Sequence, residues 1–525
     1  MGKNLTEPGR LAANEDMNNR RDFIRELLIG GGALLLAPRI LSGHAITGAV
    51  SPEAPAADAW AQVPRILARI KAPVFPKRDF VITRYGAVGD GERDCTRAFQ
   101  RAIAACSRAG GGRVVVPSGV FHTGAIHLRS NVNLHVTKGA TIKFSRDPKN
   151  YLPLVFTRWE GMELMNYSPF IYAFEQTNIA ITGTGIIDGN ASCEYWWPWK
   201  GRTGCGWKKG DPIQTAARNK LYEMVAGGTP VRERIFGEGS YLRPSFVQPY
   251  RSRNVLIEGV TLRHSPMWQI HPVLCTNVTV RNVNIEREAG ASSQTGPNAD
   301  GCDPESCKDV LIEGCTFSTG DDCIAIKAGR NNDGRRVNVP SENIIIRNCH
   351  MRDGHGGITV GSEISGGVRN VFAFDCRLDS PNLDIAIRFK NNALRGGILE
   401  NFYFKNIEVG EVADAAITID FNYEEGKNGP FTPVVRNVHV NGLRSSRSQR
   451  ALDLQGLDKA PIYSVNLENC TFQNVAKENI VKNVQGLTMR NVVINGKSVE
   501  SATETAEVPI QVTVNQNSLN IPSIA

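Results

Sequence analysis

The stretch Asn343-Ile344-Ile345-Ile346-Arg347-Asn348-Cys349 decides the fold, because closely similar stretches recur along the chain. Apolar residues occupy its second and fourth positions, a polar pair forms a corner, and a small apolar residue ends it. Period-two alternation of this kind predicts a short strand with one buried face. Eight further copies, spaced so that successive copies start 22 to 36 residues apart, begin at Asn254, Asn277, Asp309, Asn370, Asn401, Asn437, Ser464 and Gly486.

One strand and one turn per repeat leave no room for a crossover helix between most copies. The strands must therefore stack directly on one another in parallel, with the alternating residues buried against their equivalents above and below. The sequence predicts an all-β fold, a right-handed parallel β-helix with at least three strands per coil. A β-propeller is disfavoured, because its blades need about 40 residues and four antiparallel strands.

The N-terminal end of this solenoid is predicted from a second pattern. Residues 94–109 carry Phe99, Ile103 and Cys106 at helical spacing, and three glycines follow at 110–112. A helix here would cap the open apolar end of the coil. Shorter apolar segments predict earlier coils with a looser repeat, at residues 113–116, 125–128, 132–136 and 178–187.

Residues 191–245 interrupt the repeat and predict a long insertion over one rim of the coil. The insertion contains Trp196, Trp197, Trp199 and Trp207 among basic residues. These tryptophans could stack on sugars or anchor the insertion, and the sequence leaves both open. A bulky insertion of this kind would block one end of a groove along the coil.

The first 45 residues have the pattern of a twin-arginine signal peptide. Arg20-Arg21-Asp22-Phe23-Ile24-Arg25 precedes an apolar run at residues 27–37 and a small-residue cleavage site at Gly43-His44-Ala45. The apolar run is shorter than the roughly 20 residues that span a bilayer. We expect an exported protein, periplasmic or secreted, with no membrane segment in its mature form. Residues 46–78 are then a linker with a short helix, and 79–525 a single catalytic domain.

Composition narrows the class of ligand. The chain has 525 residues and a formal net charge of +8, which suits an acidic partner. It has no basic run interleaved with aromatic residues, so a nucleic-acid groove is not expected. The charge alone does not choose among acidic ligands, and nothing in the sequence calls for more than a monomer.

Several of the 12 cysteines are predicted to be buried thiols. The seventh position of the nine repeats reads Val, Val, Cys, Cys, Cys, Ile, Leu, Cys, Val, so cysteine replaces a small apolar residue in an internal stack. Three pairs outside that position are candidate disulfides: Cys95 with Cys106, Cys193 with Cys205, and Cys302 with Cys307.

Charged residues follow one another on consecutive repeats. Asp321 and His355 each lie six residues past the closing cysteine of their repeat, so they occupy equivalent positions on adjacent coils, about 4.8 Å apart. Aligning Cys302 with Ile324 puts Asp300 beside Asp322. The predicted cluster on one face comprises Asp300, Asp321, Asp322, His355, Arg388 and Lys390.

Three neighbouring carboxyl groups cannot all ionise easily, so one is expected to keep a proton near neutral pH while another stays ionised. That division supplies the general acid and the general base of glycoside hydrolysis. Arg388 and Lys390 are suited to bind an anionic group on the sugar.

These residues give the chain a resemblance to glycoside hydrolase family 28, the polygalacturonase family. Its signatures are present in order as Asn298-Ala299-Asp300, Gly320-Asp321-Asp322, Gly354-His355-Gly356 and Arg388-Phe389-Lys390, with Ala299 and Phe389 departing from the family pattern. The resemblance covers residues 80–495, including Tyr85-Gly86-Ala87-Val88-Gly89-Asp90-Gly91. It implies metal-free, inverting hydrolysis of α-1,4-galacturonide bonds in pectin.

The resemblance also implies residue roles. Asp322 is the general acid, Asp300 and Asp321 activate water, His355 assists, and Arg388 and Lys390 hold the uronate carboxylate. Further candidates are assigned around them: Asn298, His271 and Tyr423 as substrate-binding residues, Trp268 at a neighbouring subsite, and Asp303 as support for the acid cluster.

Three other functions stay open at the level of sequence. The same scaffold carries rhamnogalacturonan hydrolysis, in which the residues that recognise the sugar lie outside the shared motifs. Parallel β-helices also support calcium-dependent pectate lyases, which need a carboxylate cage for the ion. A non-catalytic adhesin is the third alternative.

Overall fold

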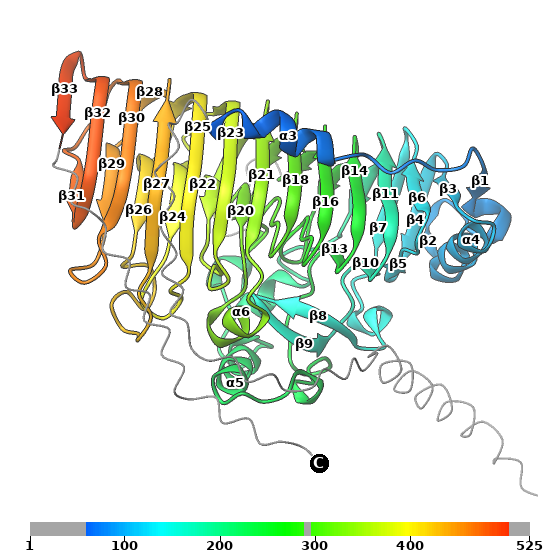
Figure 1. Cartoon of the computed structure of the whole chain (residues 1–525). Helices are drawn as coiled ribbons and strands as arrows, with labels where there is room; N and C mark the ends of the chain where they lie inside the picture. Colours follow the sequence, from blue (N-terminus) through cyan, green and yellow to red (C-terminus); the bar gives the residue numbers. More distant parts are fainter. Residues whose placement is uncertain (1–58, 288–295, 503–525) are drawn as a thin grey trace, which may run out of the picture. The chain divides into compact units, whose positions relative to one another are not determined.

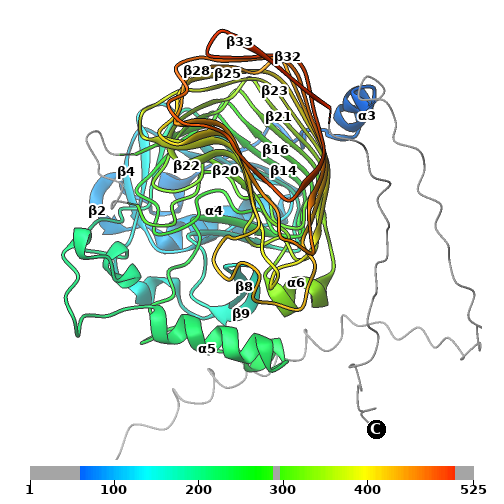
Figure 2. The ribbon, with the colours of Figure 1, turned by 90° about the vertical axis from the view of Figure 1, so that its left-hand side faces the viewer.

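The computed structural model describes residues 59–287 and 296–502, so the predicted signal peptide at residues 1–45 lies outside the described residues. The predicted parallel β-helix is confirmed, with strands stacked in parallel into three columns around an apolar core (Figures 1 and 2). The repeats identified in the sequence form one continuous column, which we call the repeat column. Its strands are β1 (Asp79–Val81), β3 (Gly112–Val116), β6 (Val132–Val136), β11 (Thr177–Gly183), β14 (Arg253–Glu258), β16 (Thr276–Arg281), β18 (Lys308–Glu313), β21 (Ser341–Arg347), β23 (Val368–Leu378), β25 (Ile398–Glu411), β27 (Val434–Asn441), β30 (Ile462–Phe472) and β32 (Val484–Ile494).

A second column follows the corner of each repeat. It contains β2 (Asp90–Asp94), β4 (Gly119–Thr123), β7 (Ala140–Phe144), β12 (Ile186–Asp188), β15 (Thr261–Arg263), β17 (Asn284–Glu286), β19 (Thr316–Ser318), the first residues of β22 (His350–Val360) and β28 (Arg444–Arg447).

The third column, which we call the site column, carries the charged cluster. Its strands are β5 (Ile126–His127), β10 (Ile171–Phe174), β13 (Val247–Tyr250), β20 (Ile324–Ile326), the last residues of β22, β24 (Leu383–Lys390), β26 (Ala415–Asp420), β29 (Arg450–Gln455) and β31 (Ile480–Lys482). Between β13 and β20 two coils contribute single bridges, which align Ile270 with Cys302 and Cys302 with Ile324.

Burial explains why the repeat sequence forms this coil. Inward side chains such as Val310, Ile312, Ile344 and Ile346 are fully buried. The stacked cysteines, including Cys315, are buried free thiols, so the prediction of a small apolar column is confirmed.

The asparagine that opens most of the repeats also links neighbouring coils. Asn254, Asn277 and Asn343 adopt left-handed φ values of 55°, 58° and 58°, which asparagine tolerates better than most residues. The side-chain amide of each asparagine donates to the equivalent residue of the preceding coil, for example from Asn277 Nδ2 to Asn254 Oδ1 at 2.7 Å. The ladder satisfies polar groups between coils.

Both ends of the coil are covered. Helix α4 (Thr96–Arg108) buries Phe99, Ile103 and Cys106 at the N-terminal end, as the spacing predicts. At the C-terminal end β33 (Lys497–Ala502) pairs with β32 in antiparallel fashion.

Helix α3 (Gln62–Arg69), in the segment expected to be a linker, lies against the outside of the repeat column. Val63 and Ile66 pack on Leu311, Ile345 and other outward side chains there. Helix α3 therefore belongs to the same compact unit as the coil.

Three excursions leave the coil on the side of the site column (Figure 1). One is the insertion predicted at 191–245, with helix α5 (Thr215–Ala226) and short 3-10 turns at Trp197–Lys200, Thr203–Cys205 and Val231–Glu233. The other two are the antiparallel hairpin of β8 (Val155–Trp159) and β9 (Met162–Asn166) and helix α6 (Asn331–Val337), which the sequence did not predict.

The tryptophans anchor the insertion to the coil. Trp196 and Trp197 are buried, and Trp197 Nε1 donates to the backbone oxygen of Ser265 at 2.8 Å. Cys193 and Cys205 form a disulfide across the same segment. The other two candidate disulfides, Cys95 with Cys106 and Cys302 with Cys307, do not form. All four residues are buried free thiols.

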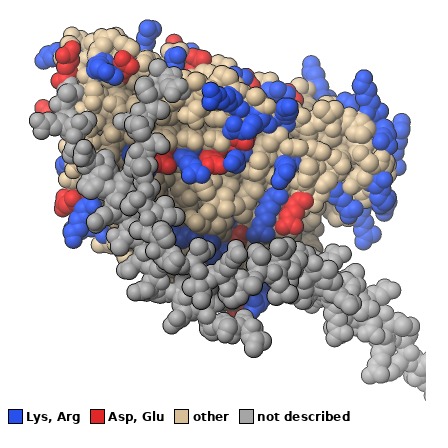
Figure 3. Space-filling model, in the orientation of Figure 1, with Lys and Arg blue, Asp and Glu red and all other residues tan. Residues whose placement is uncertain are grey.

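Exposed arginines gather at the end of the coil formed by β1 and α4, where Arg97, Arg101 and Arg108 face solvent (Figure 3). No helix within the described residues is long and apolar enough to cross a membrane.

Candidate active site

The register of the site column brings the predicted cluster together. Ile324 aligns with Ile358, and Ile358 with Ile387, so the residues around these positions stack on successive coils. The backbone N–H of His355 donates to the carbonyl of Asp321 at 3.1 Å, and that of Gly301 to Asp322 at 2.9 Å. The predicted pairings of Asp321 with His355 and of Asp300 with Asp322 are therefore confirmed.

The three carboxyl groups lie next to one another. One oxygen from each of Asp300, Asp321 and Asp322 lies within 4.8 Å of the other two. Asp322 is fully buried, and its Oδ2 accepts a hydrogen bond from Lys390 Nζ at 2.5 Å. Arg388 Nη1 lies 3.6 Å from the other oxygen of Asp322.

Asp321 has a different surrounding from Asp322. Its side chain keeps 15% exposure and faces the pocket, and its Oδ1 lies 3.2 Å from His355 Nδ1. The same oxygen accepts the backbone N–H of Asp322 at 3.0 Å. Asp321 therefore pairs with a titratable imidazole, while Asp322 pairs with permanent cations.

These surroundings shift the pKa values of Asp300 and Asp321 in opposite directions. Burial, and then the charge of Asp321, raises the pKa of Asp300 to about 8. Burial also opposes ionisation of Asp321, but the hydrogen bond and charge of His355, with Lys390 and Lys327, hold its pKa below the ordinary value. The hydrogen bond to Asp321 raises the pKa of His355 above 6.5. At neutral pH the cluster retains a proton on Asp300, as the sequence argument requires of one acid.

Lys327 is a neighbour of this cluster that the sequence argument missed. Its ammonium lies 3.5 Å from Asp300 Oδ2, 3.1 Å from Glu363 Oε2 and 3.9 Å from Asp303 Oδ2. It also lies 4.3 Å from the centre of the Trp268 ring. The sequence signal that could have identified Lys327 is a lysine at an outward position directly after the apolar strand β20.

Asp303 is fully buried behind the cluster. Burial, and then the charge of Asp300, raises its pKa well above the ordinary value. Its position agrees with the supporting role expected of it, and Lys327 is its cationic neighbour.

The cluster opens into a pocket of about 320 Å³. On the coil side it is lined by Asp300, Asp321, His355, Arg388 and Lys390. On the other side its lining comes from the excursions, with Glu160 at the tip of the β8–β9 hairpin and Lys200, Arg202 and Arg218 from the insertion. Seven Lys and Arg residues line the pocket against five Asp and Glu, so the lining has an excess of two positive charges.

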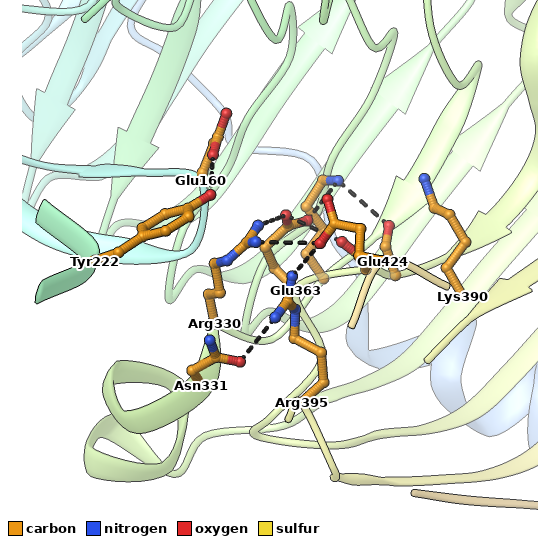
Figure 4. Close-up of polar contacts among 12 residues, drawn as sticks. Glu160, Tyr222, Arg330, Asn331, Glu363, Lys390, Arg395 and Glu424 are labelled. Atoms are coloured by element: carbon orange, nitrogen blue, oxygen red, sulfur yellow. Dashed lines mark hydrogen bonds and ion pairs between the residues drawn. The ribbon is translucent and has the colours of Figure 1, made fainter. Parts of the chain in front are cut away.

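An ion-pair network braces the floor and wall of the pocket (Figure 4). Arg330 lies 3.2 Å from Glu363 and 3.1 Å from Glu424, and its guanidinium covers the Tyr222 ring. Glu160 accepts hydrogen bonds from Tyr222 and from Arg218. These contacts join a hairpin, a helix and two coil loops that are distant in sequence, which is why no local pattern predicts them.

The other predicted substrate-binding residues divide into two groups. Asn298 and Tyr423 line the pocket, as does Trp268. The prediction for His271 is corrected, because this residue is fully buried and does not line the pocket. Its Nε2 lies 2.7 Å from Glu305, and its Nδ1 lies 3.0 Å from Ser245, so both ring nitrogens serve a buried network.

Arg243 fixes the loop that presents Asn298. This fully buried guanidinium donates to Asn298 Oδ1 at 2.8 Å, and to the backbone oxygens of Pro266 and Pro297 at 2.8 and 2.6 Å. It also donates to Gln214, the residue that precedes α5. A single side chain thus connects the insertion, the coil and the loop before Asp300.

The three carboxylates have the oxygen donors of a hard-cation site. However, the ammonium of Lys390 already lies 2.5 Å from Asp322, and that of Lys327 lies 3.5 Å from Asp300. A calcium ion bound by these oxygens would face two permanent cations at close range. The donor set therefore fits a polar substrate and water better than a calcium cage.

Comparison with known proteins gives one consistent result. Residues 237–502, which include the whole cluster, match the family model described as glycosyl hydrolases family 28. The crystal structure of a hyperthermoactive exopolygalacturonase from Thermotoga maritima shares 46% sequence identity, with a TM-score of 0.81 over 85% of this chain and 99% of that one.

Curated relatives agree with the structural match. An exo-poly-alpha-D-galacturonosidase of Dickeya chrysanthemi is 28% identical over 473 residues, covering 80% of this chain and 74% of the relative. A probable polygalacturonase of Vitis vinifera is 26% identical over 407 residues, covering 75% and 74%.

Proposed function

The chain belongs to the glycosyl hydrolases of family 28, and we propose that it hydrolyses the α-1,4-galacturonide bonds of pectin from a chain end. It is a glycosidase, and its polygalacturonase relatives support galacturonide hydrolysis. The observation that carries the proposal is the contact of the carboxylate cluster with Arg388 and Lys390, which supplies acid–base groups beside cations suited to a uronate.

The contacts support a different division of roles from the one that the family resemblance implies. Asp322 is fully buried with Lys390 and Arg388 beside its two oxygens, so it is placed as a proton acceptor rather than as a proton donor. Asp321 faces the pocket and is paired with His355, which can supply its proton. We assign Asp321 as the general acid and Asp322 as the base, with Asp300 holding the water beside it.

In this mechanism Asp322 takes a proton from water, the resulting hydroxide attacks the anomeric carbon, and Asp321 protonates the departing glycosidic oxygen. Arg388 and Lys390 hold the carboxylate of the sugar whose bond is cleaved or of its neighbour. The inverting outcome rests on the family resemblance. The oxygen separations within 4.8 Å are shorter than the roughly 6.5–9.5 Å usual for inverting pairs, so stereochemistry needs direct measurement.

Exo cleavage is supported by two observations. The hairpin and the insertion form one wall of the pocket through Glu160, Lys200, Arg202 and Arg218. The relative with 46% identity is an exopolygalacturonase. A wall of this kind leaves room for a chain end and obstructs a chain that continues past it.

The export pattern of residues 1–45 suits an enzyme whose polymeric substrate lies outside the cell. We retain export through the twin-arginine route, a periplasmic or secreted location, and a monomeric mature enzyme as parts of the proposal. Mass determination of the mature protein would test cleavage near residue 45.

Product analysis tests the activity. With polygalacturonate we expect galacturonate monomer, new reducing ends and no unsaturated uronate, with or without a chelator. The same incubation with rhamnogalacturonan should release little product. Unsaturated products that disappear with chelator would identify a lyase instead, and proton NMR of the first product reports inversion or retention.

A further inference from the structure

Lys200 differs from the other cations of the pocket in its contacts. Arg218 is paired with Glu160, Arg330 with Glu363, and Lys390 with Asp322. Within residues 59–287 and 296–502, Lys200 makes no hydrogen bond or ion pair although its side chain lines the pocket. A half-buried ammonium without a partner is costly unless a ligand supplies the anion.

The electrostatic surroundings of Lys200 agree with its contacts. Burial lowers the pKa of Lys200, Glu160 opposes that shift, and the charges of Arg243 and Arg218 add to it. Burial is the largest cause of the lowered pKa, and Glu160 and Asp321 only partly offset it. A bound anion would offset it further.

The segment around Lys200 is held in place on both sides. Lys200 ends a 3-10 turn that starts at Trp197, whose indole is bonded to Ser265 of the coil. It is followed by Gly201 with φ of 80°, and the disulfide between Cys193 and Cys205 closes the segment. Such constraints reduce the entropy lost when a side chain binds a ligand.

Lys200 and Lys390 approach the carboxylates from opposite ends of the site. The insertion comes before β13 in the sequence, and the coil of β13 precedes the coils that carry Asp300 and Asp321. Lys390 lies two coils after Asp322. In Figure 4, Glu160, which lines the same pocket as Lys200, lies on one side of the Arg330 and Glu363 contacts and Lys390 lies on the other. The pocket therefore offers cations from the insertion, Lys200 among them, as well as Arg388 and Lys390 from the coil.

We propose that Lys200 binds the carboxylate of the terminal, non-reducing galacturonate, while Arg388 and Lys390 bind the carboxylate of the adjacent sugar. This inference rests on the proposed function and extends it to specificity. The enzyme then requires free carboxylates on both sugars that flank the cleaved bond. A methyl ester on either sugar removes the anion that its cation needs.

Trigalacturonate with a methyl ester on the non-reducing-end sugar is the test substrate, and unesterified trigalacturonate is the reference. For the wild-type enzyme we expect the terminal ester to lower kcat/KM by about 10- to 100-fold, the usual effect of losing a hydrogen bond to a charged group. Lys200→Met should lower kcat/KM for the free acid by a similar factor and leave the ester nearly unchanged. Discrimination against an ester on the second sugar should persist in this variant.

Lys209→Met provides the matched control, because Lys209 is an exposed lysine of the same insertion. Lys209→Met should behave as the wild-type enzyme. Lys200→Arg should discriminate against the terminal ester, as the wild-type enzyme does and Lys200→Met does not. Equal rates of the wild-type enzyme on the two trimers would overturn the inference, as would a Lys200→Met variant that slows both substrates equally. Wild-type enzyme that releases no galacturonate from the free trimer would instead refute the proposed function.

Discussion

Replacement of His355 by glutamine tests the assignment of Asp321 as the general acid. In the native site Nδ1 of His355 lies 3.2 Å from Oδ1 of Asp321. The pKa of His355 is raised above 6.5 and that of Asp321 is held below 3.8. The pair therefore keeps a proton available as pH rises, until His355 itself deprotonates.

Glutamine preserves the size and the hydrogen-bonding capacity of the side chain but removes the titrating group and its charge. Asp321 would then carry a proton only in the ordinary range of carboxyl pKa values, well below that of the imidazole. The alkaline limb of kcat/KM should move to lower pH by about two units. At pH 6.5 the variant should retain roughly 1% of its own maximum, where the wild-type enzyme retains half or more.

Initial rates of reducing-end release from polygalacturonate, measured from acidic to mildly alkaline pH, give both profiles. His350→Gln is the control, because His350 lies on the same strand β22 but outside the pocket. An alkaline limb that stays in place in His355→Gln, with only the maximum reduced, would refute the role of His355 as proton source. That result would favour Asp322 as the acid.

Three further substitutions have defined outcomes. Asp322→Asn should lower kcat by about 10²- to 10⁴-fold with KM nearly unchanged, measured on polygalacturonate, and retained turnover would exclude a role for Asp322 as base. Lys390→Met should lower kcat/KM about 10- to 100-fold, mainly through KM, and an unaltered KM would count against carboxylate binding there. Glu363→Gln removes the buried carboxylate that contacts both Lys327 and Arg330 and should lower the free energy of unfolding by about 3–5 kcal/mol in denaturant titrations at neutral pH. Because the pKa of Glu363 is depressed in the fold, its stabilisation exists above the ordinary carboxyl pKa and disappears as pH falls, so wild type and variant should converge in acid; equal stability at neutral pH would contradict this.

The cluster itself was predictable because its geometry follows from the repeat. In a parallel stack each residue lies about 4.8 Å above its equivalent in the preceding coil. Counting from Cys315 and Cys349 was therefore enough to place Asp321 beside His355, and the hydrogen bonds agree. The same counting placed Asp300 beside Asp322.

Residues outside the repeat escaped this counting. Glu160, Lys200 and Arg330 reach the pocket from a hairpin, an insertion and a helix whose paths have no common period. His271 shows the converse error, because its burial depends on Glu305 of the next coil, and nothing near His271 in sequence indicates that partner.

The sequence by itself determined the coil, its register and the six charged residues that this register aligns, since alternation and vertical stacking are local and repetitive. Tertiary structure alone decided which of these acids is buried against cations, which faces the pocket, and which wall closes it. Those properties depend on desolvation and on charges brought together from distant segments, such as Lys390 with Asp322 and Lys200 opposite them.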